Sequence, residues 1–115
     1  MEAEISHVPS KDAKKFNRLF GKSMRISRHD YTFVWCTDLQ LNGVGIQGLC
    51  DSESKTIYVA ISKDVEETVI HEIVHAEFYE AGLRQRHDHD ANLEEQVCEI
   101  LAKGLSSAFK FRERK

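Results

Sequence analysis

The feature that most constrains this chain is a run of apolar residues at helical spacing between residues 64 and 82. Steps of three and four residues place them on one side of an α-helix; the members are Val65, Val69, Ile70, Ile73, Val74 and Phe78. Acidic residues at the start of the run suit the positive end of the helix dipole, and Gly82 can adopt the left-handed conformation that ends a helix. We therefore expect a helix that buries one side against the rest of the domain.

The remaining segments predict a small sheet and two further helices. Lys11 to Phe20 and Ala91 to Phe109 both carry apolar residues at helical spacing. Tyr31 to Thr37 is rich in aromatic and β-branched residues, as strands are. Val44 to Cys50 and Thr56 to Ile61 flank a polar turn and indicate a hairpin. We expect an α+β fold with an N-terminal helix, a three-stranded and mostly antiparallel sheet whose last strand lies at the edge, and two C-terminal helices.

Length and charge exclude several classes of protein. The 115 residues predict one domain over 1–115. The 16 basic and 19 acidic residues give a net charge of −3, so no general basic field exists to bind nucleic acid. No apolar run approaches the roughly 20 residues of a membrane span, and the N-terminal segment lacks a signal peptide's apolar middle. Three cysteines without a C-x-x-C pair predict reduced thiols. We expect a cytoplasmic monomer or small homo-oligomer that binds no membrane.

The first predicted C-terminal helix contains the sequence His71-Glu72-Ile-Val-His75, an H-E-x-x-H motif. Residues four apart share a helix face, so both imidazoles can bind one metal ion, while Glu72 can reach a water molecule on that ion. Zinc in catalytic sites takes three protein ligands and an open position. The motif therefore predicts a zinc site that needs one more ligand.

The second C-terminal helix offers Glu94, Glu95 and Glu99 as that third ligand. Glu95 lies at the edge of the apolar side and can point into a cleft between the helices, so it is the preferred candidate. Glu99, one turn further on, could accept a hydrogen bond from the other nitrogen of a ligand histidine. Glu94 stays open as the alternative ligand, because it lies nearer the centre of the apolar side, where a carboxylate needs a partner.

His71-Glu72-x-x-His75 followed by Glu95-x-x-x-Glu99 resembles the gluzincin pattern of thermolysin-like metallopeptidases. The resemblance implies Zn²⁺ held by His71, His75 and Glu95, with Glu72 as general base and acid. It covers about residues 56 to 105. The small size and element order resemble minigluzincins and the ImmA/IrrE-type metallopeptidase domains of phages and mobile elements, which implies the cytoplasm of a host cell as the location.

The sequence differs from related zinc peptidase patterns in ways that exclude one class and leave one site residue unassigned. A metzincin has a third histidine where this chain has Ala81, so that class is excluded. The residue that steadies the oxyanion in gluzincins stays open among Tyr79, His87 and His89. We expect a zinc metallopeptidase that hydrolyses a peptide or protein substrate. The alternative is a non-catalytic, zinc-stabilised module that acts by protein contact, as a phage or mobile-element accessory protein would.

Overall fold

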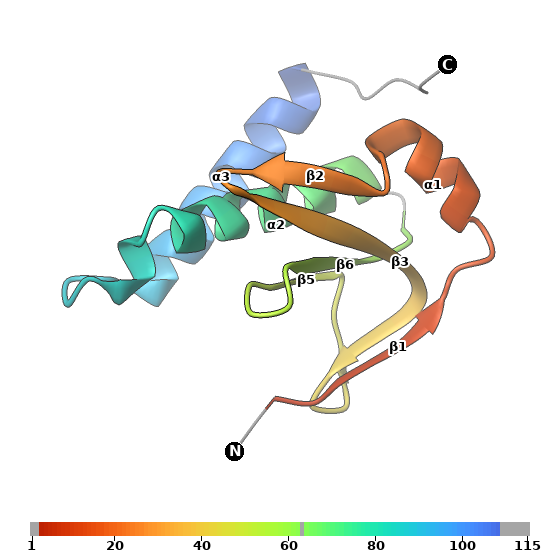
Figure 1. Ribbon diagram of the computed structural model, residues 1–115, viewed down its shortest axis with the longest axis horizontal. Helices are drawn as coiled ribbons and strands as arrows, with labels where there is room; N and C mark the ends of the chain where they lie inside the picture. Colours follow the sequence, from red (N-terminus) through yellow and green to blue (C-terminus); the bar gives the residue numbers. More distant parts are fainter. Residues whose placement is uncertain (1–2, 63, 109–115) are drawn as a thin grey trace.

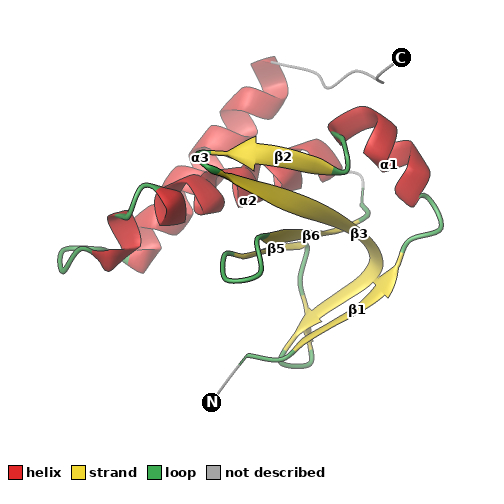
Figure 2. Ribbon diagram, in the orientation of Figure 1, coloured by secondary structure: helices red, strands yellow, loops and turns green. Residues whose placement is uncertain are grey.

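A computed structural model describes residues 3–62 and 64–108 (Figure 1). These residues form an α+β fold with a mixed sheet and three α-helices (Figure 2). The elements in chain order are β1 (Ile5–Pro9), α1 (Ala13–Phe20), β2 (Ser23–Ile26), β3 (His29–Leu41), β4 (Val44–Gly45), β5 (Gly48–Asp51), β6 (Thr56–Ala60), α2 (Val65–Glu80), the 3-10 turn η1 (Leu83–Gln85) and α3 (Ala91–Ala108).

The sheet is organised around β3, which is 13 residues long and pairs with several partners along its length. The strand order is β1-β3-β6-β5, and both β2 and β4 also pair with β3. The pairing of β3 with β6 is parallel, whereas the other pairs are antiparallel. The prediction of three strands was therefore wrong, because the described residues form six. The prediction that Thr56 to Ile61 forms the edge was also wrong, because β6 lies between β3 and β5.

The hydrophobic core lies on one face of this sheet, against α1 and α2. Alternate residues of β3, namely Tyr31, Phe33 and Trp35, are buried, as the period of a strand requires. Ile57 and Val59 of the neighbouring β6 are fully buried in the same cluster. The remaining core members come from the helices and β2: Phe20, Ile26, Val65, Val69 and Ala76. Of the predicted apolar residues of α2, Val65 and Val69 belong to this core and Ile73 packs partly against it, so only part of the predicted apolar side covers the sheet.

The end of α2 is tied to the sheet by Glu80. Its carboxylate accepts hydrogen bonds from Tyr31 Oη at 2.6 Å, Lys55 Nζ at 2.6 Å and His29 Nδ1 at 2.8 Å. Hydrogen bonds from Lys55 and Tyr31 lower the pKa of Glu80 to about 2. Just beyond it, Gly82 has φ +76°, as expected of the residue that ends this helix. The carboxylate and the cap together fix where α2 stops.

α3 packs against α2 (Figure 1), but its large apolar side chains are not the ones buried in that contact. Its buried residues are Glu94, Cys98 and Ala102. Its large apolar side chains are exposed instead, with Leu93 at 57% and Ile100 at 69%, and Leu101 and Leu105 about two-fifths exposed. The predicted position of Phe109 lies outside the described residues. None of the helices in the described part of the chain has the length and apolar character needed to cross a membrane.

Candidate metal centre

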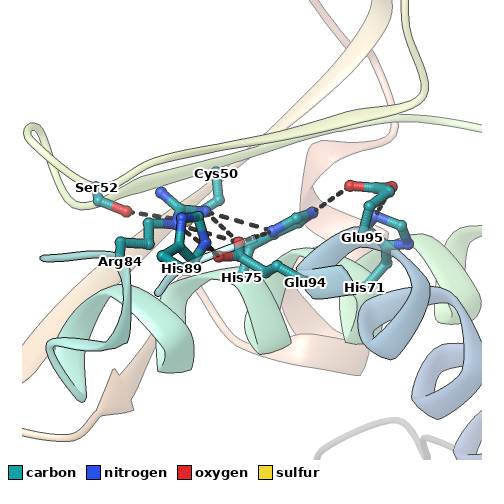
Figure 3. Close-up of polar contacts among 8 residues, drawn as sticks. All are labelled: Cys50, Ser52, His71, His75, Arg84, His89, Glu94 and Glu95. Atoms are coloured by element: carbon teal, nitrogen blue, oxygen red, sulfur yellow. Dashed lines mark hydrogen bonds and ion pairs between the residues drawn. The ribbon is translucent and has the colours of Figure 1, made fainter. Parts of the chain in front are cut away.

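His71 and His75 lie one turn apart on α2, with ring centroids 5.0 Å apart, and both face α3. The Nε2 atom of His71 is 2.8 Å from one carboxylate oxygen of Glu95, and the Nε2 atom of His75 is 2.9 Å from the other. One ligand atom from each of these three residues lies within 4.8 Å of the others, so the group could hold a metal ion. Figure 3 shows the Glu95 carboxylate beside the two imidazoles.

The other nitrogen of His75 faces Glu94. His75 Nδ1 is 2.6 Å from Glu94 Oε2, and Glu94 is only 4% exposed. Arg84 donates to Glu94 from Nε and Nη2, and His89 Nε2 is 2.8 Å from Glu94 Oε1. Burial by itself raises the pKa of Glu94, but hydrogen bonds from Arg84, His75 and His89 lower it to about 2. Glu94 is therefore an ionised carboxylate that can only accept hydrogen bonds.

The short contact between Nδ1 and Glu94 favours one tautomer of His75 over the other. Because ionised Glu94 only accepts, Nδ1 of His75 carries the hydrogen, and Nε2 of the neutral ring carries a lone pair. That lone pair points at the Glu95 carboxylate, so two acceptors face each other. A cation between them, or a second proton on the ring, satisfies both. Two imidazoles and one carboxylate are a donor set that zinc takes with an open position, so the residues fit the ion.

Glu72 lies on α2 between the two histidines and faces the sheet. It is 7% exposed, and burial raises its pKa to about 7, against the lowering effect of His75. β5 approaches it closely at Gly48: a Cβ atom there would lie 2.9 Å from Glu72 Oε2 and 2.7 Å from Thr68 Cγ2. Only glycine at this position leaves room for the Glu72 carboxylate beside β5.

A second group, His75, Glu94 and Cys98, also brings possible ligand atoms together. It suits a metal ion less well. Both oxygens of Glu94 already accept hydrogen bonds from Arg84, and one of them also faces His89. The positive charge of the Arg84 guanidinium repels a cation at this place. Burial raises the pKa of the Cys98 thiol to about 12, whereas the metal-binding form of cysteine is the thiolate. Cys98 is fully buried.

Two cavities open beside His71, Glu72 and Glu95, which line both. The one toward the C-terminal half of α3 has a volume of about 330 Å³, and Gln47, Glu67, Glu99 and Lys103 are among its other lining residues. The second, of about 290 Å³, is lined in addition by His75, Arg84 and three apolar side chains, Leu41, Ile46 and Leu49. Gly48 of β5 also lines both cavities, so the strand runs past the candidate site.

The structure brings together His71, His75 and Glu95 as the motif predicted. The hydrogen-bond acceptor that faces His75, a candidate ligand, is Glu94, however, and not Glu99, so that expectation was wrong. Within residues 3–62 and 64–108, Glu99 lines a cavity without a hydrogen bond to either histidine. Glu94 is buried in α3 and faces Nδ1 of His75, whereas Glu99 lies five residues further along the helix and is exposed.

The expected oxyanion candidates do not gather at the site. Tyr79 packs on Lys55, His87 is exposed, and His89 contacts Glu94 rather than either cavity. Asp90 caps α3 by accepting hydrogen bonds from two backbone N–H groups. Arg84 was missed, because an arginine in a polar loop carries no sequence signal of its own.

Comparison with known proteins finds no matching family model, no matching curated protein and no matching solved structure.

Proposed function

We propose that this chain is a zinc-dependent metallopeptidase of the gluzincin type, with a single zincin-like domain. The observation that carries the proposal is the convergence of two imidazole Nε2 atoms on the carboxylate of Glu95, next to the buried carboxyl group of Glu72. His71, His75 and Glu95 would hold the ion. Zinc bound there supplies a Lewis acid that polarises the scissile carbonyl and makes water a stronger acid.

The chain's own residues perform the proton transfers. Glu72 accepts a proton from the attacking water and later donates it to the leaving amine. Glu72 follows His71 directly in α2. Its carboxyl group lies against Gly48 of β5, which keeps it beside the proposed ligands. Glu94 holds His75 through Nδ1, so that Nε2 stays available for the ion.

β5 supports a peptide as the substrate. It is the last strand of the order β1-β3-β6-β5, so one of its edges is unpaired within the described residues, and it lines both cavities beside the ligands. An extended peptide can add to such an edge through main-chain hydrogen bonds. The scissile bond would then lie across the His71, His75 and Glu95 group.

The decisive variant is Glu72→Gln, which removes the proton acceptor but keeps the size of the side chain. We expect hydrolysis of a peptide library to fall at least about a hundredfold, while zinc content stays unchanged. Glu77→Gln is the matched control, since Glu77 is an exposed carboxylate on the same helix. Hydrolysis that survives in the Glu72→Gln protein would refute the assigned role of Glu72.

The alternative, a zinc-stabilised module that acts by protein contact, is favoured by one observation. α3 exposes Leu93, Ile100 and Leu101 on its outer side, and apolar patches of this kind occur at protein interfaces. The same Glu72→Gln variant separates the two functions, because a contact-based activity would survive it.

A further inference from the structure

Arg84 occupies one end of the cavity of about 290 Å³ beside His75. We call this the arginine cavity; its other walls are Leu41, Ile46, Gly48, Leu49, Cys50, His71, Glu72, His75 and Glu95. Figure 3 shows Arg84 on the opposite side of His75 from His71. The cavity therefore joins the candidate metal ligands to a cationic group, with apolar side chains between them.

The guanidinium of Arg84 is only partly used inside the protein. Its Nε and Nη2 atoms donate to Glu94, at 3.1 and 2.7 Å. Its third nitrogen, Nη1, has no hydrogen-bond partner among residues 3–62 and 64–108. The side chain is 33% exposed, so it is accessible to a ligand from the cavity. Nη1 carries two N–H donors, which remain available to such a ligand.

The carboxylate of Glu94 balances the charge of Arg84, and it also accepts hydrogen bonds from His75 and His89. Glu72 and Glu95 add negative charge to the same cavity, but the zinc ion of the proposed function would offset it. What Arg84 offers an anion is therefore the pair of unused N–H donors on Nη1, and a guanidinium is well suited to bind a carboxylate.

We propose that Arg84 binds a carboxylate of the substrate, close to the scissile bond. The neighbouring substrate side chain would pack on the apolar wall formed by Leu41, Ile46 and Leu49. The carboxylate has two possible sources, the C-terminal carboxylate of a short peptide or the side chain of Asp or Glu. This inference rests on the proposed function, since it names the substrate class of that site.

The test measures binding of three peptides to the zinc-loaded full chain carrying Glu72→Gln, which blocks turnover. The first is an N-acetylated tetrapeptide ending in leucine with a free carboxylate, the second its C-terminal amide, and the third that amide with one residue changed to Asp. We expect at least one of the two carboxylate peptides to bind about tenfold more tightly than the neutral amide, as one charge-assisted pair provides. The peptide that shows this preference identifies the source of the carboxylate.

Arg84→Gln should reduce the preference to less than about twofold, and Arg84→Lys should keep part of it. Arg86→Gln is the matched control: Arg86 lies two residues away, is exposed and pairs with Asp88, and its loss should leave the preference intact. Because Arg84→Gln leaves the buried Glu94 without its cation, the double variant Arg84→Gln/Glu94→Gln is measured as well, and it should also lack the preference. A preference that persists in both Arg84→Gln proteins overturns the proposal.

Equal binding of all three peptides to the parent protein also overturns the proposal, even where zinc binds and a library of peptides with blocked ends is cleaved. The proposed function and the carboxylate preference can also fail separately. If zinc fails to bind or no peptide is cleaved, the proposed function fails, whereas a carboxylate preference that depends on Arg84 would still stand as a binding property.

Discussion

The close approach of β5 to α2 makes Gly48→Ala the most informative single change in the fold. A methyl group at this position would lie 2.7 Å from Thr68 Cγ2, 2.9 Å from Glu72 Oε2 and 3.1 Å from Glu72 Cγ. Thr68 and Glu72 are 6% and 7% exposed, so neither can swing into solvent without moving the helix. The extra methyl group must therefore separate the strand from α2 or displace the Glu72 carboxyl group.

Overpacking of this kind costs about 1–3 kcal/mol. We expect Gly48→Ala to lower the free energy of unfolding by about 2 kcal/mol, which corresponds to a fall of roughly 1 M in the urea midpoint. Peptide hydrolysis should fall by more than the loss of folded protein explains, because the displaced group is the proposed proton acceptor.

Urea unfolding of matched variants tests whether the added methyl group overpacks the contact between β5 and α2. Gly45→Ala is the control, since a Cβ atom at Gly45 meets nothing within 4 Å, and it should change stability by less than about 0.5 kcal/mol. Thr68→Ser removes the atom in closest contact, so combining it with Gly48→Ala should recover about 1 kcal/mol relative to additivity. If Gly48→Ala unfolds at the same urea concentration as Gly45→Ala, the packing argument is wrong.

Three further predictions test other parts of the structure. Glu94→Gln should weaken zinc binding by about 10- to 100-fold in a chelator competition, because it loosens the hold on a ligand histidine; unchanged affinity would contradict this. The pKa of Glu80 lies near 2, below its ordinary value of 4.5, so the stability this carboxylate provides is present above about pH 4.5 and is lost as the pH falls toward 2. Glu80→Gln should therefore lower stability at pH 7 and flatten the decline below pH 4.5, unlike Glu77→Gln, as followed by urea unfolding across pH. Val69→Ala, at a fully buried position, should lower the free energy of unfolding by about 2 kcal/mol, whereas Leu93→Ala should change it by less than about 0.5 kcal/mol, in the same unfolding assay.

The sequence predicts best where local rules decide the structure. The limits of α2 follow from its apolar spacing and from Gly82, which adopts the left-handed conformation beyond the helix. The hairpin of β5 and β6 follows from a polar turn between two apolar segments, and the antiparallel pairing of these strands confirms it. The H-E-x-x-H spacing places two imidazoles on one side of α2, since only helix geometry is involved.

Features that depend on distant parts of the chain were not predictable in this way. β1 (Ile5–Pro9) is mostly exposed and has no strand-like apolar alternation, so its pairing with β3 carries no local signal. The parallel pairing of β3 with β6 joins strands that are not neighbours in sequence. α3 faces α2 with Glu94 rather than with its leucines, because the buried carboxylate finds hydrogen-bond donors in His75 of α2 and Arg84 of η1.

If His71, His75 and Glu95 bind one zinc ion, the metal content of the protein will show it. Elemental mass spectrometry of protein purified without chelators, then reloaded with zinc, would compare the parent chain with His75→Ala, Glu95→Ala and Glu99→Ala. We expect about one zinc ion per chain in the parent protein and in Glu99→Ala, and little or none in the other two variants. A parent protein that neither carries nor rebinds zinc would refute this metal site, as would full zinc content in Glu95→Ala.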